Sequence, residues 1–479
     1  MTVGYERLHL SNGPNRQKLT SIVVLLVLFL SLTVAGIVLA FAVLDRPPFP
    51  PDPGTGNSSI NQCSMVLVES IPLHVTYQDN ETLGIPLEQV WKDLISLAST
   101  QLDVVSFYWT LTAEDIGINS SSAKPGRDIL TQLGMLPSRN VSVRVITSIP
   151  TVVTNTTDLQ FLKQNGVQVR RVNFGRLTGG VLHSKFWIVD RKHVFIGSPN
   201  MDWRALTQVK ELGVRIYNCS SLAEDLHKIF QSYWVMGESS STLPQPWPAE
   251  YDAAFSKQRP LLVEEDGVPS SVYISASPPS FCPPTRTLDL EAILSIMSEA
   301  EEFVDISVMQ YSPNTYFTRP QRYWPFIDTA IRTAAFETNV KFRMLISCGR
   351  DSDPAVLPFL QSLASLGSPS QQLNIEIKLF IVPVGNQSDI PYTRINHNKY
   401  MVTDKVAYIG TSNWSGDYYM FTAGVGLVIS PHAPPQTEAT PTLQMQLKAV
   451  FDRDWHSEFA VRLSDLGHHP DCALAKPLD

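Results

Sequence analysis

The most distinctive hydrophobic pattern in the chain is a long uncharged run near its N-terminus. From Leu19 to Leu44 no residue carries a charge, and the centre of the run is almost wholly aliphatic. A helix needs about 20 apolar residues to cross a bilayer, whereas the apolar part of a cleaved signal peptide usually spans only about 7–15. We therefore predict a retained transmembrane anchor at residues 19–44.

Charges before this run predict its orientation. Arg7, Arg16 and Lys18 precede it and only Glu6 opposes them, so residues 1–18 should form a cytosolic tail. The protein is then a type II membrane protein, with a Pro-rich lumenal stem at residues 45–62. The tail contains Tyr5-Glu6-Arg7-Leu8, which resembles the sorting signal read by clathrin adaptors, although this pattern also arises often by chance.

Beyond the stem the hydrophobic pattern repeats with long spacing. Four short β-branched segments recur in the same order 199 to 214 residues later, with helix-like stretches between them, for example at 87–98 and 325–336. Strand–helix alternation favours an α/β fold, and the repetition predicts two similar halves, 63–245 and 246–479, related by a pseudo-two-fold axis. The halves should meet within the Pro-rich stretch 243–283. The matched pairs are Gln101–Tyr108 with Phe303–Gln310, Asn140–Ser148 with Asn339–Ser347, Val167–Arg170 with Ile375–Lys378, and His183–Asp190 with His397–Asp404.

The last matched pair carries the candidate chemistry. Each copy has the form His-x-Lys, at His183/Lys185 and at His397/Lys399. Side chains two apart on a strand emerge on the same face, so each histidine would lie beside a fixed positive charge. We expect the two copies to form one active site. The two lysines supply its positive charge, so we predict neither a metal nor a cofactor.

Each motif has a tail that extends the match. Asp190 and Asp404 follow the lysines, and we include both in the catalytic set, although bracing of turns is the favoured role. Further on, the chain reads Gly197-Ser-Pro-Asn200 and Gly410-Thr-Ser-Asn413. Hydroxyl and amide groups can donate to phosphoryl oxygens, so we predict phosphate contacts from Ser198, Asn200, Thr411 and Asn413.

These motifs resemble those of the phospholipase D superfamily, His-x-Lys-x4-Asp followed by Gly-Ser-x-Asn. Within it, the segments Met201–Gly213, His397–Thr403 and Gly410–Ser415 look like phospholipase D family members three and four, and Ile381–Asn386 leans towards member four. The resemblance implies a 5′ exonuclease on single-stranded DNA and RNA that releases nucleoside 3′-monophosphates. It also implies a lumenal enzyme of the endoplasmic reticulum, Golgi, endosomes and lysosomes, and leaves open proteolytic release from the anchor and a homodimer.

The superfamily mechanism implies that one histidine attacks phosphorus while the other, protonated, donates to the leaving oxygen. Glu211 lies 28 residues after His183, where the family places a carboxylate that orients its histidine; the same count from His397 reaches Val425. On that basis we predict His183 as the nucleophile, oriented by Glu211, and His397 as the proton donor.

An oxidising lumen also predicts disulfides and glycans. For the five cysteines we expect Cys63–Cys219 and Cys348–Cys472, with Cys282 free, although spacing alone does not determine the pairing. Eight sequons follow the anchor, and we expect that at Asn413, inside the motif, to be unmodified. The predicted glycosylation sites are Asn57, Asn80, Asn119, Asn140, Asn155, Asn218 and Asn386.

The formal net charge of −8 does not by itself favour a polyanionic substrate. Protonation of all ten histidines would bring it to about +2, so an acidic lumen favours nucleic-acid binding. Two alternatives stay open: a phosphodiesterase or transphosphatidylase acting on phospholipid, and a non-catalytic glycoprotein. Intact motifs in both halves count against the second. Phe107–Trp109 and Tyr323–Trp324 could stack on bases, but we assign them to the core.

Overall fold

The computed structural model describes residues 61–77, 83–151, 156–265, 267–367, 373–433, 441–467 and 469–475. The predicted tail, the anchor, most of the stem, the Tyr5–Leu8 signal and the sequons at Asn57, Asn80 and Asn155 lie outside these residues. Within the described ranges, no helix is both long enough and apolar enough to cross a membrane.

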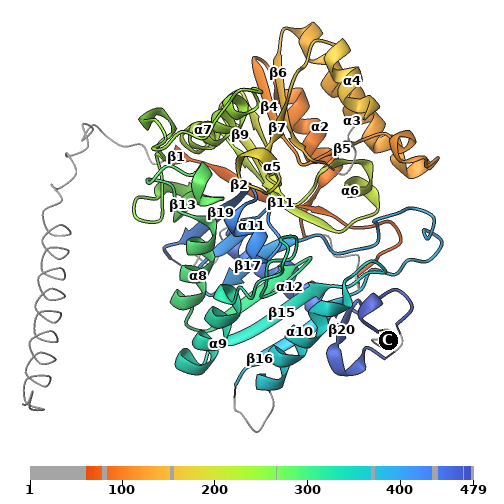
Figure 1. The fold of residues 1–479 in the computed structure, drawn as a ribbon, viewed down its shortest axis with the longest axis vertical. Helices are drawn as coiled ribbons and strands as arrows, with labels where there is room; N and C mark the ends of the chain where they lie inside the picture. The colour runs from red at the N-terminus through yellow and green to blue at the C-terminus, as the bar shows by residue number, and fades with distance from the viewer. Residues whose placement is uncertain are drawn as a thin grey trace, which may run out of the picture. The chain divides into compact units, whose positions relative to one another are not determined.

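The first half forms an eight-stranded sheet, drawn from red to yellow-green in Figure 1. Its central strand β8 is buried at every position, as expected for a strand that is covered on both faces. The strands, in spatial order, are β3 (Ile85–Pro86), β2 (Ser64–Ser70), β11 (Glu211–Tyr217), β9 (His193–Gly197), β8 (Phe186–Val189), β4 (Gln101–Val105), β6 (Ser142–Ile149) and β7 (Gln168–Asn173).

The second half forms a ten-stranded sheet, mostly green to blue in the same view. Two residues that we expected to end the stem pair with this sheet as β1, and the Pro-rich stretch that we expected to separate the halves contributes β12 and β13. The spatial order is β1 (Asn61–Gln62), β12 (Leu261–Glu265), β13 (Val268–Ser277), β19 (Gly424–Pro431), β18 (Ala407–Gly410), β17 (Lys399–Thr403), β14 (Phe303–Val308), β15 (Lys341–Ser347), β16 (Ile375–Phe380) and β20 (Ala460–Arg462).

The two sheets have the same topology. The order β2-β11-β9-β8-β4-β6-β7 in the first sheet corresponds strand by strand to β13-β19-β18-β17-β14-β15-β16 in the second. Each of the four repeated sequence segments overlaps a pair of equivalent strands. The predicted duplicated α/β fold is therefore confirmed. The predicted halfway point, residues 245 and 246, falls in the segment that joins α7 to β12.

Helices cover both faces of each sheet. On the outer face of the first sheet, α2 buries Leu87, Val90, Trp91, Leu94 and Ile95, the spacing of an amphipathic helix. Between the sheets, α7 and α12 share one continuous core with strands from both halves. The longer helices are α2 (Leu87–Leu97), α3 (Lys124–Met135), α4 (Thr157–Gln164), α7 (Ser220–Met236), α8 (Asp289–Glu299), α9 (Phe326–Thr338), α10 (Leu357–Ala364) and α12 (Leu443–His456). The short helices are α5 (Phe174–Leu177), α6 (Trp203–Thr207) and α11 (Gly416–Met420). Outside the two large sheets, β5 (Trp109–Thr110) pairs with β10 (Met201–Asp202).

The cysteines pair as expected. A disulfide joins Cys63 to Cys219, the residue before α7, and a second joins Cys348, after β15, to Cys472 near the C-terminus. Cys282 is free. The described sequons at Asn119, Asn140, Asn218 and Asn386 are exposed, whereas Asn413 is buried; glycosylation of the exposed ones remains a prediction.

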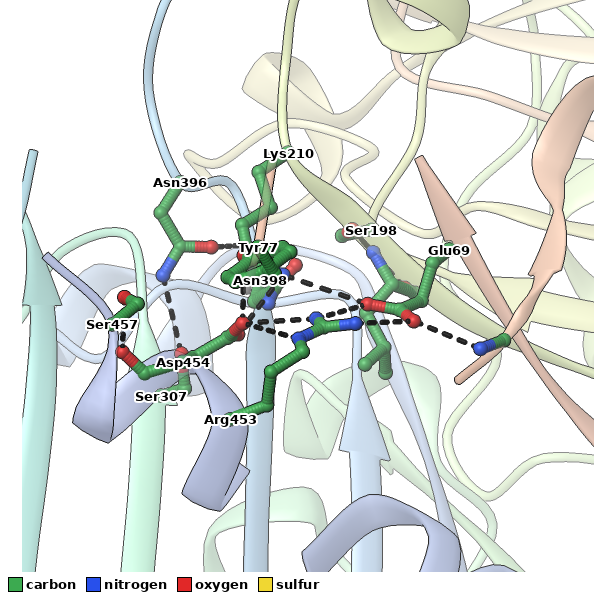
Figure 2. A network of polar contacts seen from close by, with 12 residues as sticks. Glu69, Tyr77, Ser198, Lys210, Ser307, Asn396, Asn398, Arg453, Asp454 and Ser457 are labelled. Atoms are coloured by element: carbon green, nitrogen blue, oxygen red, sulfur yellow. Dashed lines mark hydrogen bonds and ion pairs between the residues drawn. The ribbon is translucent and has the colours of Figure 1, made fainter. Parts of the chain in front are cut away.

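A buried ionic network joins the two halves (Figure 2). Arg453 of α12 lies 2.6 Å from Glu69 of β2, and Lys210, just before β11, lies 2.9 Å from Asp454 of α12. The Tyr77 hydroxyl donates to Asp454 at 2.8 Å. Burial raises the pKa of Glu69, but Lys210 and Arg453 outweigh that effect and hold it at about 2. Glu69 therefore stays charged in a mildly acidic compartment, and the stability that its ion pairs contribute is lost only as the pH falls towards 2.

Glu69→Gln should lower the free energy of unfolding by about 3–5 kcal/mol, because it leaves Lys210 and Arg453 buried without one of their anions. The measurement is denaturant unfolding at pH 5 and pH 7. Glu88→Gln is the matched control, since Glu88 pairs with Lys92 on the half-exposed surface of α2, where such pairs contribute about 0–1 kcal/mol. Equal, small effects of the two substitutions would contradict this account.

Candidate active site

The two His-x-Lys segments lie directly before or at the start of the central strands β8 and β17. The His183 N–H donates to the Ala423 carbonyl at 2.9 Å, and the His397 N–H donates to the Lys210 carbonyl at 2.8 Å. Ala423 precedes β19 and Lys210 precedes β11, the equivalent strand of the other half. Each motif is therefore held by the opposite half, which brings two segments that are 214 residues apart in the sequence into one site.

The imidazole partners differ between the two histidines. His397 Nδ1 lies 2.8 Å from Glu211 Oε2, and His183 Nδ1 lies 2.8 Å from the Thr411 carbonyl oxygen. Our prediction that Glu211 orients His183 is therefore wrong. The crossed pairing explains the error: the Lys210 carbonyl binds the His397 backbone, so the side chain of the next residue reaches His397.

The second half has no counterpart of this carboxylate. Gly213 pairs with Gly197 and Gly426 pairs with Gly410, so the equivalent of Glu211 is Gly424 rather than Val425. A Cβ atom at Gly424 would lie 2.1 Å from Ser412 Oγ, too close for a side chain in the present arrangement.

The hydrogen-bond partners determine the tautomer of His183. A carbonyl oxygen only accepts, so Nδ1 of His183 must carry the proton and Nε2 keeps a free electron pair in the neutral ring. Burial and the charges of Lys185 and Lys399 hold the pKa of His183 well below its usual range. Burial also lowers the pKa of His397, but the Glu211 carboxylate opposes that shift and favours the imidazolium form.

Both motif lysines are buried, each with 1% of its surface exposed. Lys185 Nζ donates to the His183 carbonyl at 2.5 Å, and Lys399 Nζ donates to the His397 carbonyl at 2.7 Å. Burial lowers the pKa of Lys399 to about 7 and that of Lys185 well below its usual range. Two ammonium groups buried at one site attract an anion that replaces their lost solvation.

Of the four predicted phosphate contacts, only the two asparagines line the cavity that holds the histidines. This cavity has a volume of about 370 Å³ and is lined by His183, His397, Asn200 and Asn413. Asn200 Oδ1 and Asn413 Oδ1 have no hydrogen-bond partner among the described residues, and Asn413 Nδ2 donates to the Tyr418 hydroxyl.

The predicted phosphate contacts of Ser198 and Thr411 are wrong. The Ser198 hydroxyl donates to Glu211 Oε2 at 2.5 Å and accepts from the Leu212 N–H. The Thr411 hydroxyl is bonded to both backbone groups of Val425. Both residues are fully buried. Ser198 therefore positions the carboxylate on His397, and the backbone carbonyl of Thr411 positions His183.

Asp190 and Asp404 are not part of the site, so their inclusion in the catalytic set is wrong. Asp190 accepts hydrogen bonds from the backbone and side chains of Ser99 and Thr100 and from the Gln101 N–H. Asp404 accepts from the N–H groups of Glu301 and Glu302. These hydrogen bonds connect the turn after each motif strand to the start of β4 or β14. This is the role in bracing turns that the sequence favoured.

The cavity also contains residues that sequence reasoning missed. Phe107 and Tyr108, which we assigned to the core, line it, as do Asp202, Arg204 and Tyr418. The Tyr108 hydroxyl donates to Asp202, which also accepts from Arg204. Phe107 and Tyr108 follow β4, which pairs with the motif strand β8. This position in the sequence could have indicated that they lie at the site. Trp109 and Trp324 are buried as expected, whereas Tyr323 is exposed, so its assignment to the core is wrong.

No group of three or more His, Cys, Asp or Glu side chains in the described part of the chain is arranged to hold a metal ion.

Comparison with known proteins shows to which family the chain belongs. Residues 79–385 match the family described as PLD3/4, PLD-like domain. The chain belongs to this family. The human protein named 5'-3' exonuclease PLD4 is 49% identical over 428 residues, covering 89% of this chain and 84% of the human protein. The Xenopus tropicalis protein named 5'-3' exonuclease PLD3 is 50% identical over 407 residues, covering 85% of this chain and 82% of that protein.

A solved structure shares the family's fold at much lower identity. The phosphatidylserine synthase of Haemophilus influenzae superposes with a TM-score of 0.51 at 12% identity, covering 79% of this chain and 86% of that one. This similarity supports the duplicated fold alone.

Anion binding at the lysines should depend on pH. Lys399 is charged below its pKa of about 7, so sulfate should bind most tightly in acid and weaken by about tenfold per pH unit above that value. Sulfate stays a dianion between pH 5 and 9, which makes calorimetric titration across this range a direct measurement. Lys399→Met should weaken sulfate binding and reduce the pH dependence, and a wild-type affinity that does not change with pH would contradict the assignment.

Proposed function

We propose that this protein is a lysosomal 5′ to 3′ exonuclease that cleaves single-stranded DNA and RNA through a phosphohistidine intermediate and releases nucleoside 3′-monophosphates. The observation that carries the proposal is that the histidines of both His-x-Lys motifs line one cavity, with a carboxylate on only one of them. The names of the PLD4 and PLD3 relatives support the choice of nucleic acid as substrate.

The first chemical step uses the asymmetry of the histidines. Neutral His183 attacks phosphorus through Nε2, and the bond from phosphorus to the 5′ oxygen of the next nucleotide breaks. His397, whose imidazolium form is favoured by the Glu211 carboxylate, donates a proton to that departing oxygen. The terminal nucleoside stays attached to phosphorus through its 3′ oxygen, so the intermediate is a nucleoside 3′-phosphoryl histidine.

The second step reverses the proton transfer. His397, now neutral, takes a proton from water, which attacks phosphorus as the bond to His183 Nε2 breaks. Lys185, Lys399, Asn200 and Asn413 act on the non-bridging oxygens, where negative charge builds up in both transition states. The proposed roles of the two histidines are those predicted from the sequence, but the reason for them differs. Glu211 pairs with the proton donor rather than with the nucleophile.

We further propose that the enzyme is a single-pass type II membrane protein with its glycosylated catalytic part in the lumen. The uncharged run at residues 19–44, the basic residues before it and the exposed sequons support this topology. Protection of the C-terminus from protease in sealed vesicles, together with sensitivity to glycosidase, is the expected result; digestion of the C-terminus would contradict it.

The direct test of the function is hydrolysis of a 5′-hydroxyl oligonucleotide at pH 5 by the purified lumenal part, with phospholipid vesicles assayed in parallel. We expect successive release of nucleoside 3′-monophosphates from the 5′ end. Lys185→Met should lower kcat/KM by about a hundredfold to a thousandfold, because it removes a charge that stabilises the transition state.

Lys192→Met is the matched control, since Lys192 is exposed in the turn after β8. It should leave the rate unchanged. Turnover of phospholipid without turnover of the oligonucleotide would overturn the proposed function in favour of the lipid alternative.

A further inference from the structure

A second cavity adjoins the catalytic one and lies within the second half of the chain. It has a volume of about 220 Å³ and shares three wall residues, Met309, Tyr392 and Ile395, with the catalytic cavity of about 370 Å³. A substrate whose phosphate binds between the histidines could therefore extend directly into this second cavity.

The shared wall flanks His397 rather than His183. Ile395 is two residues before His397, and the Met309 N–H donates to the carbonyl of Asn398, the residue after it, at 2.9 Å. In an in-line displacement the leaving group departs opposite the attacking His183, on the side where His397 donates its proton. The second cavity, called here the leaving-side cavity, is thus next to the leaving oxygen.

The lining of this cavity does not suit another phosphate. None of the described residues that line it is Lys or Arg, and two of them are Asp351 and Asp353. The remaining lining is largely apolar or aromatic, and Tyr316 donates to Asp353 at 2.9 Å. Carboxylates repel a phosphate and accept N–H groups, so the cavity fits a flat, uncharged group that carries N–H donors.

Tyr392 supplies an aromatic side chain at the boundary between the two cavities. Tyr392 is 68% exposed although it lines both cavities. Its backbone has φ = 54°, the left-handed region that a bulky residue rarely adopts unless its surroundings impose it.

The backbone around Tyr392 is held from the first half of the chain. Arg204 donates to the Pro391 carbonyl at 2.8 Å, and the Arg394 N–H donates to the Gln208 carbonyl at 3.1 Å. Arg204 is itself buried and paired with Asp202 in the catalytic cavity. The position of Tyr392 is therefore coupled to the wall of the active site.

We propose that the leaving-side cavity binds the base of the second nucleotide, the one that departs with the 5′ oxygen, and that this base stacks on Tyr392. The inference rests on the proposed nuclease function and adds a specificity-determining residue to it. Stacking suits all four bases, because each has a π face.

The test compares two dinucleotides that differ only in the second base. One is thymidylyl-(3′→5′)-thymidine and the other carries an abasic tetrahydrofuran in place of the second thymidine; both release thymidine 3′-monophosphate. Wild-type enzyme should cleave the first with a kcat/KM about 5- to 100-fold higher. Tyr392→Ala should lose this preference and cleave the two dinucleotides with similar kcat/KM, and this remaining turnover also shows that the variant is folded.

Two further variants complete the experiment. Tyr392→Trp keeps an aromatic ring and should keep the preference. Phe336→Ala removes an aromatic ring from a residue of similar exposure, 61%, on α9 and outside both cavities, and should change nothing. A wild-type preference that persists in Tyr392→Ala, or no preference in the wild type, would overturn the inference. Failure of the wild type to cleave either dinucleotide would instead overturn the proposed function.

Discussion

The site depends on an exchange of backbone hydrogen bonds between the two halves. The segment before β19 accepts the His183 N–H, and the segment before β11 accepts the His397 N–H. Without these bonds the two motifs would be the ends of separate sheets. The buried network of Glu69, Lys210, Arg453 and Asp454 surrounds the second of these crossings, so the same residues that stabilise the interface also hold the segment that bears Glu211.

The exchange is nearly symmetric in the backbone and asymmetric in the side chains. Lys210 and Ala423 play the same backbone role, but the residues that follow them are Glu211 and Gly424. Consequently one histidine faces a carboxylate and the other faces a peptide carbonyl. In a duplicated site with two equivalent histidines, either one could act as the nucleophile. A carboxylate on one of them distinguishes the two, so that the paired histidine acts as the acid and the other as the nucleophile.

Much of the fold could be predicted because the duplication preserves local patterns that depend on neighbours in the sequence. The strand segments, the helical stretch at 87–98 and both His-x-Lys motifs are of this kind. The hydrogen bond between Glu211 and His397 is different, since it joins residues 186 positions apart. It depends on which segments of the two halves come into contact. The loop before Gly410 is one residue shorter than that before Gly197, which shifted the expected equivalence from Gly424 to Val425. Ser198 was misassigned for a related reason. The residue type indicates that its hydroxyl can donate a hydrogen bond, but only the folded structure shows that Glu211 is the acceptor.

The central claim is that neutral His183 attacks phosphorus and His397, paired with Glu211, serves as the acid. The most direct measurement is mass spectrometry of the enzyme after a brief pulse with thymidine 3′-(4-nitrophenyl phosphate), whose leaving group departs without a proton. The account predicts a nucleoside phosphoryl adduct on His183 in His397→Ala and no adduct in His183→Ala. An adduct on His397 in His183→Ala, with none on His183 in His397→Ala, would contradict it.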